Sequence, residues 1–334
     1  MAKRTRLKRA LKIIGLILAA LLLLAVCAAA WFLTRPPKPA KIYDPQPAGR
    51  RVTDNGMFAN YFPANGAGRR PGILLLGGSE GGLARDLLRQ AMLLQRHGYN
   101  VLHVAYHNAP SKPATLTAVP LEEFRRGLDW LKTRPEVDPA SLAVVGYSKG
   151  AEAALLIATR YPGIRAVVAG MPSSVSWDAL DSISILTGLH SSWSENGREV
   201  PSLSYGWYDG GRGLHAVFED GLKRLDQHPD AIIPVERFRG RLLLICGEKD
   251  NLWPSCRMAD QIRARAIRSA GGPHPLLLRY ADAGHGVMGA PGAATDPDIR
   301  RFAQLGGTAE ANSAARADSW PKILAFLRTA FERE

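Results

Sequence analysis

The chain of 334 residues has few cysteines, no internal repeat and no low-complexity tract beyond a short proline-rich stretch. Three cysteines, at positions 27, 246 and 256, are too few for a fold built on disulfides. Cys27 lies in an apolar N-terminal run, and Cys246 ends a strand-like run where we expect a small buried apolar side chain. The missing repeat excludes a solenoid or array, so this length predicts one large domain or two small ones.

Acidic residues are absent before Asp44. Residues 1–42 hold nine lysines and arginines, so only about +4 of the formal net charge of +13 remains for the rest of the chain. That remainder is unremarkable, and neither a basic stripe nor a base-stacking motif accompanies it. The charge therefore argues against a nucleic-acid partner.

The N-terminal region has no charged residue between positions 13 and 33. A helix of these 21 residues is about 30 Å long, which matches the hydrocarbon core of a bilayer. Six basic residues precede it, and by the positive-inside rule they place the N-terminus in the cytoplasm. We therefore predict a basic cytoplasmic tail at 1–12, a single-pass signal-anchor helix at 13–33 in the inner or plasma membrane, and the rest of the chain outside the cytoplasm.

Two other interpretations of this region remain open. Small residues at 28–30 suit a cleaved signal peptide, which would leave the protein secreted, although the apolar run is long and continues past them. A lipoprotein signal ending at Cys27 fits less well, because Val26 stands where such signals usually have a smaller residue. Residues 34–69, with a proline-rich start, are expected to form a linker and leading segment.

From about residue 70 the chain alternates short apolar runs with amphipathic stretches. The expected strands are 73–76, 101–104, 142–145, 166–168, 242–246 and 276–280, and the expected helices are about 84–97, 121–132, 151–160 and 319–331. Short, nearly all-apolar strands that alternate with helices predict an α/β domain over 70–334, with a mostly parallel sheet and helices on both faces.

One section, about 171–237, interrupts this alternation. It has no clear strand–helix pair and is rich in serine, glycine and tryptophan, with Trp177, Trp193 and Trp207. Three large aromatic side chains add apolar area that a solvated loop would not need. We predict a lid-like insertion that forms a binding surface, and a surface excursion without function is the alternative.

A candidate nucleophile lies between an expected strand and an expected helix. Gly146-Tyr147-Ser148-Lys149-Gly150 follows the strand that ends at Val145 and precedes a helix. This is the context of a nucleophile elbow in the α/β-hydrolase fold, where a tight turn leaves no room for side chains two positions before and after the serine. A glycine-rich turn with an incidental serine is the alternative. We predict that Ser148 is the nucleophile, placed at a helix N-terminus that favours developing negative charge.

A serine nucleophile needs a base, and the base needs an orienting acid, which in this fold follow in the order Ser, Asp or Glu, His. Asp250 lies just past the strand 242–246 and is favoured over Glu248, which comes too early in the turn, and over Asp282, which is almost adjacent to the best histidine. The eight histidines are His97, His103, His107, His190, His215, His228, His274 and His285. Of these, only His285 follows Asp250 at the carboxyl end of a strand. His97 is expected to cap a helix, and His103 to lie in or near the core.

The oxyanion hole needs two backbone donors. One is predicted to be the N–H of Lys149, and the other the N–H of Ser79 or Glu80 in the loop 77–82, which the sequence does not separate. The glycines of this loop do not have the spacing of a phosphate-binding motif. No metal-ligand cluster is visible, and the predicted chemistry requires no cofactor.

Several of these segments together resemble a known family. Gly146–Glu152, the run 233–255 around the acid, and Gly284-His285 are similar to the C-terminal catalytic domain of acyl-CoA thioesterases and bile acid-CoA:amino acid N-acyltransferases, which is dienelactone-hydrolase-like. The resemblance covers about 70–330. It implies a nucleophile, acid and base at Ser148, Asp250 and His285, and the serine resembles the hydrolase branch, because the amidating transferases usually carry cysteine there.

The predicted function is therefore a serine hydrolase that cleaves an acyl thioester or an acyl ester. Residues 34–70 are too few for the β-sandwich domain that precedes the hydrolase domain in the animal enzymes. Coenzyme A thioesters are cytoplasmic, whereas the charge pattern places this domain outside, so the acyl-CoA substrate is the weakest part of the resemblance. An acyltransferase to an amine or alcohol, and a non-catalytic anchored scaffold, are the alternatives. The sequence does not determine the oligomeric state.

Overall fold

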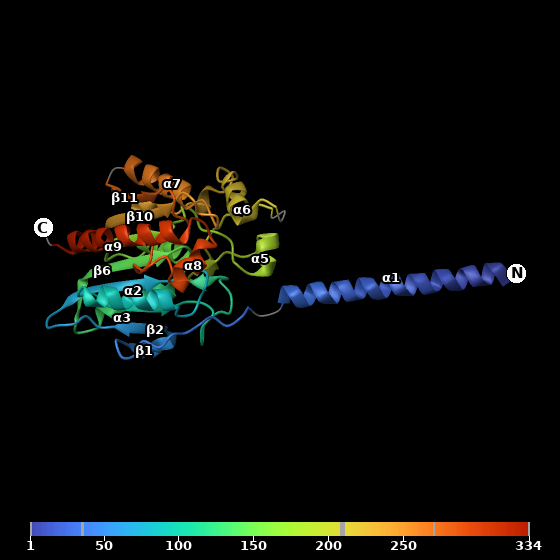
Figure 1. Cartoon of the computed structure of the whole chain (residues 1–334), viewed down its shortest axis with the longest axis horizontal. Helices are drawn as coiled ribbons and strands as arrows, with labels where there is room; N and C mark the ends of the chain where they lie inside the picture. Colours follow the sequence, from blue (N-terminus) through green and yellow to red (C-terminus); the bar gives the residue numbers. More distant parts are fainter. Residues whose placement is uncertain (1, 35–36, 208–210, 270, 333–334) are drawn as a thin grey trace. The chain divides into compact units, whose positions relative to one another are not determined.

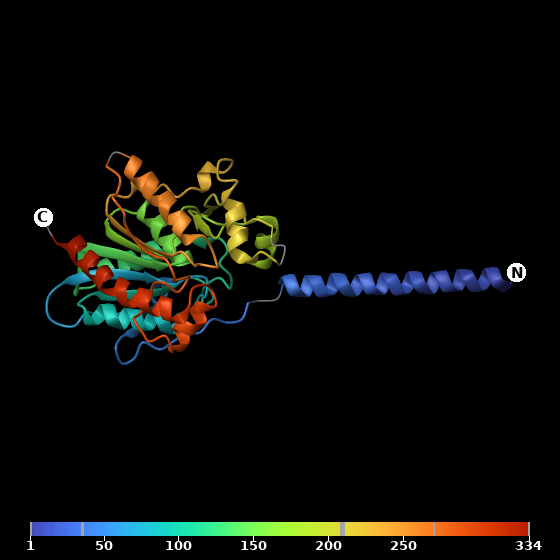
Figure 2. The same ribbon diagram turned by 45° about the horizontal axis from the view of Figure 1, so that its top comes forward.

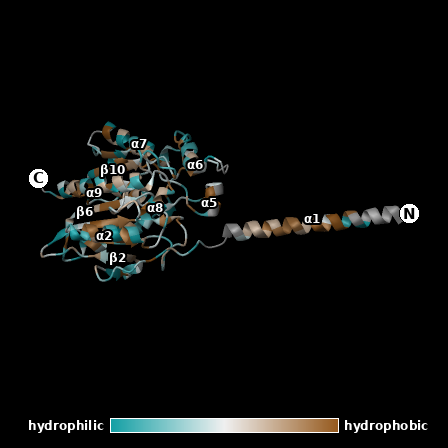
Figure 3. Ribbon diagram, viewed as in Figure 1, coloured by the Kyte–Doolittle hydropathy of each residue, from teal (hydrophilic) through white to brown (hydrophobic). Residues whose placement is uncertain are grey.

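The computed structural model describes residues 2–34, 37–207, 211–269 and 271–332, and the chain divides into two compact units, Met1–Lys38 and Pro39–Glu334. The first unit is the helix α1 (Ala2–Thr34), which contains the predicted apolar run. Its segment Leu11–Trp31 is long and apolar enough to cross a membrane, a test that a signal sequence also passes. Figure 3 shows that the middle of α1 is mostly hydrophobic.

The second unit is built on an eight-stranded sheet in the order β1-β2-β4-β3-β6-β7-β10-β11. The strands are β1 (Arg50–Val52), β2 (Phe58–Phe62), β3 (Arg70–Leu76), β4 (Asn100–Ala105), β6 (Val137–Tyr147), β7 (Ile164–Gly170), β10 (Arg241–Gly247) and β11 (Leu276–Tyr280). β2 is antiparallel to β1 and to β4, and the other neighbours are parallel. The sheet is thus mostly parallel, as predicted.

The segment expected as linker and leading segment, 34–69, contains β1 and β2. The physical reason is burial, since Val52, Tyr61 and Phe62 are at most 2% exposed and extend the two apolar faces of the sheet. The sheet therefore begins about 20 residues before position 70.

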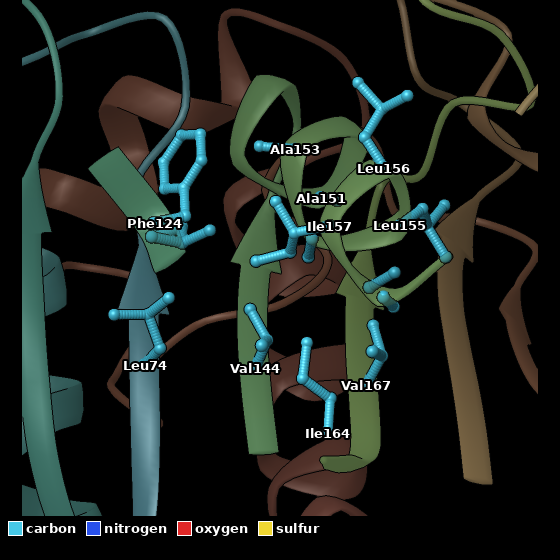
Figure 4. Packing of buried hydrophobic residues seen from close by; sticks show 14 of the residues in the cluster. Leu74, Phe124, Val144, Ala151, Ala153, Leu155, Leu156, Ile157, Ile164 and Val167 are labelled. Atoms are coloured by element: carbon cyan, nitrogen blue, oxygen red, sulfur yellow. The ribbon is translucent and has the colours of Figure 1, made fainter. Parts of the chain in front are cut away.

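Helices cover both faces of the sheet (Figures 1 and 2). One face carries α2 (Arg85–Arg96) and α9 (Ala309–Phe331), and the other α3 (Glu122–Lys132), α4 (Lys149–Ala158) and α7 (Ser255–Arg268). Alternate residues of each strand point to opposite faces. Thus Leu74 and Val144 belong to the core under α3 and α4, seen in Figure 4, whereas Leu75 and Val145 belong to the core under α2 and α9. Each such side chain contributes about 1.5–3 kcal/mol by its burial.

The described residues of the insertion, 171–207 and 211–237, contain regular secondary structure. It contains α5 (Ser182–Thr187), β8 (Trp193–Glu195), β9 (Arg198–Glu199), α6 (Gly213–Leu222) and two short 3-10 turns, η2 (Pro229–Ala231) and η3 (Val235–Arg237). β8 pairs with β5 (Val119–Pro120) and β9 in a small second sheet. Trp177 and Trp193 are fully buried, whereas Trp207 is 75% exposed. Two of the three tryptophans therefore build a core, and the third lies at the surface.

Candidate active site

Ser148 occupies the sharp turn between β6 and α4. Its backbone has φ +53° and ψ −119°, in the left-handed region that is unfavourable for a residue with a side chain. The neighbouring glycines make the turn sterically feasible. A Cβ on Gly146 would lie 2.3 Å from the Gly150 carbonyl oxygen, and one on Gly150 would lie 2.1 Å from the carbonyl oxygen of Gly77. The glycine spacing seen in the sequence is therefore required by the backbone.

The helix α4 begins at Lys149, directly after Ser148. The first N–H groups of a helix have no partner within the helix, and the helix dipole adds partial positive charge at this end. The N–H groups of Ala151 and Glu152 return to the Ser148 carbonyl at 2.9 and 3.0 Å. The N–H of Lys149 is thus the first of these N–H groups at the N-terminus of α4.

The Asp250 side chain is held by a complete set of hydrogen bonds in the loop between β10 and α7. Oδ1 accepts from the backbone N–H groups of Leu252 (3.0 Å) and Trp253 (3.2 Å), and Oδ2 accepts from the Ser255 hydroxyl at 2.7 Å. The residue is 3% exposed. These three donors hold the buried carboxylate in one direction.

Asp250 Oδ2 also lies 2.9 Å from Nδ1 of His285, which follows β11 in the glycine-flanked loop. With Nδ1–H donating to the carboxylate, the neutral imidazole presents Nε2 as an acceptor. His285 and Ser148 line the same cavity, which has a volume of about 280 Å³. The structure thus joins Asp250 to His285 and places both His285 and Ser148 at one cavity.

The rival acids and bases lie elsewhere. Glu248 forms an ion pair with Arg279 at 2.5 Å, and Asp282 is exposed. His97 caps the C-terminus of α2, and His103 is buried in β4, as expected for both. The His215 ring contacts the backbone oxygen of Asp250 at 2.7 Å, rather than its carboxylate.

The loop 77–80 is held by two adjacent side chains that directly follow β4. The Tyr106 hydroxyl lies 2.6 Å from the Gly77 oxygen and 3.2 Å from the Gly78 oxygen, and His107 Nε2 lies 3.4 Å from the Ser79 oxygen. Burial lowers the pKa of His107 to about 4, so its ring is neutral near pH 7. Both Ser79 and Glu80 line the cavity that holds Ser148.

The Glu80 carboxylate accepts a hydrogen bond from the N–H of Gly78 at 3.1 Å. That donor is therefore already engaged within the loop. The carbonyl oxygens of residues 77 to 79 contact the Tyr106 and His107 side chains, and a peptide N–H points opposite to the carbonyl of the same peptide unit. The peptide N–H groups of Ser79 and Glu80 consequently point away from these two side chains.

The helix α9 holds the His285 loop on both sides. Asn312 Oδ1 accepts from the N–H of Gly284 at 2.8 Å, and Arg316 Nε donates to the oxygen of Gly286 at 2.8 Å. Neither Asn312 nor Arg316 was predicted from the sequence. The available indication was a polar pair four residues apart on the buried face of a helix that was expected to begin only at 319.

Cys246 is fully buried, as expected, but it forms a disulfide with Cys256 that was not predicted. Cys246 lies in β10 and Cys256 in the first turn of α7, with 5.1 Å between their Cα atoms. The parallel strand and the returning helix bring them together, which the sequence spacing of ten did not reveal. The disulfide closes the loop that carries Asp250.

A buried ion pair links the nucleophile turn to the insertion. Lys149 Nζ contacts the Glu152 oxygens at 2.9 and 2.8 Å, and Glu152 Oε1 accepts from Trp193 Nε1 (2.7 Å) and from the N–H of Trp177 (2.9 Å). Burial lowers the pKa of the Lys149 ammonium and raises the pKa of the Glu152 carboxyl, while their contact opposes both shifts. The Lys149 side chain is therefore tied to Glu152 as part of the domain interior.

Ser148 borders a second cavity, of about 260 Å³, on the side of the insertion. Its lining is mainly apolar: Leu180, Ile185, Tyr205, Leu214, Val217, Phe218, Leu252 and Trp253, with Ser79, Ser148 and Lys149 at the other end. The first cavity instead includes the charged side chains of Glu80, Asp86 and Arg301. Ser148 thus lies between an apolar cavity and a more polar one.

The sheet order and the strand–serine–helix turn define an α/β hydrolase. In agreement, the fold matches a putative dienelactone hydrolase from Klebsiella pneumoniae (TM-score 0.52, 16% identity, 84% of this chain and 97% of that chain). It also matches the Pyrococcus furiosus esterase Pf2001 (TM-score 0.54, 17% identity, 88% of this chain and 99% of that chain).

Residues 119–333 match the family described as BAAT / acyl-CoA thioester hydrolase C terminal, and the chain belongs to this family. Its relatives include mouse acyl-coenzyme A thioesterase 5, 28% identical over 84% of this chain and 65% of that protein. Mouse mitochondrial acyl-coenzyme A thioesterase 2 is 27% identical over 84% of this chain and 60% of that protein. The chain therefore spans less than two thirds of the length of these relatives. The predicted family resemblance is confirmed.

Proposed function

We propose that the protein is a serine hydrolase that cleaves an acyl thioester or acyl ester, with Ser148 as nucleophile, His285 as base and Asp250 as the orienting acid. The observation that carries the proposal is the 2.9 Å contact between Asp250 and His285 at the cavity that Ser148 lines. Membership of a family whose relatives are named acyl-coenzyme A thioesterases supports the reaction class.

In the proposed reaction, His285 Nε2 takes the Ser148 proton as the oxygen attacks the acyl carbonyl. The Asp250 carboxylate stabilises the imidazolium that forms. The N–H of Lys149, together with that of Ser79 or Glu80, binds the oxyanion of the tetrahedral intermediate. His285 then protonates the leaving thiolate or alkoxide, and a water molecule, deprotonated by His285, releases the acid from the acyl-enzyme.

We further propose that 13–33 anchor the chain in a membrane, with the N-terminus in the cytoplasm and the hydrolase domain outside. The basic residues before the apolar run support this orientation. The Cys246–Cys256 disulfide supports it independently, because structural disulfides persist in oxidising compartments and are rare in the cytoplasm. An extracytoplasmic domain would meet acyl esters, or thioesters other than those of coenzyme A.

The test is hydrolysis by the detergent-solubilised chain of matched acyl-CoA and p-nitrophenyl ester series, with Ser148→Ala as the control. We expect ester cleavage that the substitution abolishes. CoA release abolished by the same substitution would keep the hydrolase and contradict the proposed location. A chain that does not turn over either series and does not react with a fluorophosphonate would contradict the hydrolase itself and favour the scaffold alternative.

A further inference from the structure

Most of the exposed large apolar side chains of the hydrolase domain belong to the insertion, and two of them, Ile185 and Leu214, also line the apolar cavity. Among the described residues of Pro39–Glu334, eight such side chains are exposed. Six of them belong to the insertion or to residues 39–43, here called the entering chain because they lead from the N-terminal helix into the domain. These six are Ile42, Ile183, Ile185, Leu189, Trp207 and Leu214, with exposures from 37% to 75%. The other two, Ile267 and Leu276, lie on α7 and β11. A cluster of this kind marks an interaction surface.

The cluster, here called the apolar rim, is continuous with the cavity. Ile185 and Leu214 are exposed on one side and line the cavity on the other. Trp207 follows Gly206, whose N–H is bonded to the oxygen of Val217, another lining residue. An acyl chain that enters beside Ile185 and Leu214 would therefore occupy the cavity that Ser148 also lines.

The entering chain places the rim at the end of the domain where the N-terminal helix is attached. The N–H of Tyr43 bonds to the oxygen of Leu83 at 3.0 Å, and the N–H of Ala40 bonds to Asn108 Oδ1 at 3.1 Å. Both contacts lie beside the loop 77–82. The helices α5 and α6 lie at this same end of the domain (Figures 1 and 2).

Chain length then limits what can cover the rim. Only residues 35–38 separate α1 from the second unit, and four residues span about 15 Å when fully extended. A bilayer that holds the apolar run of α1 is therefore close to the end of the domain that 39–43 occupy. That end carries the rim.

We propose that the apolar rim docks on the surface of a lipid bilayer, and that the substrate is an acyl lipid that enters the apolar cavity from that bilayer. This inference rests on the proposed hydrolase function for the identity of the reaction. The docking itself rests on the rim and on the proposed membrane anchor at 13–33. Buried Trp and Ile side chains at a membrane interface supply affinity in proportion to the apolar area they bury.

The experiment uses the full chain reconstituted in phosphatidylcholine vesicles. Two substrates are compared, a long-chain 4-methylumbelliferyl ester dissolved in the bilayer and the water-soluble p-nitrophenyl acetate. The rim variant is Ile183→Ser/Leu189→Ser/Trp207→Ser, which leaves the cavity lining intact. The matched control is Ile267→Ser/Leu276→Ser, which removes similarly exposed side chains outside the rim.

We expect the rim variant to lose about tenfold or more in kcat/KM on the vesicle ester and to keep its activity on the soluble ester. The control should behave as the wild type on both. An unchanged rate on the vesicle ester, or an equal loss on both substrates, would overturn the proposal.

A second measurement does not depend on turnover. Lipids with brominated acyl chains should quench the part of the fluorescence that Trp207→Phe removes. If that part is not quenched, the rim does not touch the bilayer. If it is quenched but neither ester is hydrolysed, the docking surface stands and the proposed hydrolase function fails.

Discussion

Arg316 Nε donates a hydrogen bond to the backbone oxygen of Gly286 at 2.8 Å, directly after His285 in the chain. The same guanidinium contacts Asp86 Oδ1 at 3.2 Å, and the arginine is 1% exposed. One buried side chain therefore connects α9, α2 and the loop that carries the proposed base. Arg316 is a positioning residue, because it acts on His285 through the backbone.

This arrangement predicts that Arg316→Met destabilises the domain by about 3–5 kcal/mol, because the Asp86 carboxylate remains buried without its partner. The double variant Arg316→Met/Asp86→Asn should recover much of that stability. It should still have a lower kcat than Asp86→Asn alone, since the bond to Gly286 is missing. Urea unfolding and steady-state kinetics separate the two effects. If the double variant recovers both its stability and its kcat in full, Arg316 only balances the charge of Asp86.

The disulfide predicts a thiol count and a stability change. In unreduced, denatured protein an alkylating reagent should modify only Cys27, and after reduction all three cysteines. Cys246→Ala/Cys256→Ala should lower the free energy of unfolding by about 2–4 kcal/mol. We expect kcat to fall as well, because Cys256 adjoins Ser255, which holds Asp250. Cys27→Ser is the control, and three reactive thiols before reduction would contradict the pairing.

The Lys149–Glu152 ion pair predicts that the Lys149 ammonium is structural and takes no part in the proposed reaction. Lys149→Met leaves a buried carboxylate unpaired and should cost about 3–5 kcal/mol in stability. Lys149→Met/Glu152→Gln should restore most of it, because the glutamine oxygen still accepts from Trp177 and Trp193. The double variant should then hydrolyse esters at nearly the wild-type rate at neutral pH. A stable but inactive double variant would show that the ammonium itself takes part.

Buried histidines predict that the domain loses stability in acid. Burial lowers the pKa of His103 to about 3, below its ordinary value of 6.5. Between these values the unfolded chain binds a proton that the folded chain does not, so stability falls as pH decreases from 6.5 toward 3. One such group contributes a slope of at most about 1.4 kcal/mol per pH unit. His103→Leu should reduce the slope in urea unfolding between pH 6.5 and 5 by about that amount, and an unchanged slope would contradict the assignment.

Much of this domain could be predicted because its features are local in the chain. The strand runs are nearly all apolar, which a sheet covered on both faces requires, and six of the eight strands were located within a few residues. Ser148 was recognisable because the tight turn has no room for side chains at the glycine positions on either side of it. β1, β2 and α7 were not predicted, because their hydrophobic patterns are short or mixed. Only packing against the rest of the sheet makes these segments a strand or a helix.

By itself the sequence determined the apolar N-terminal run, the parallel α/β order and the positions of Ser148, Asp250 and His285 after their strands. All of these follow from periodicity, turn chemistry and chain order. Only the tertiary structure decided that Asp250 bonds to His285, that Cys246 pairs with Cys256, and that α9 holds the histidine loop. These contacts join segments whose separation in sequence carries no information about distance, because the sheet and its covering helices bring them together only when the whole core is packed.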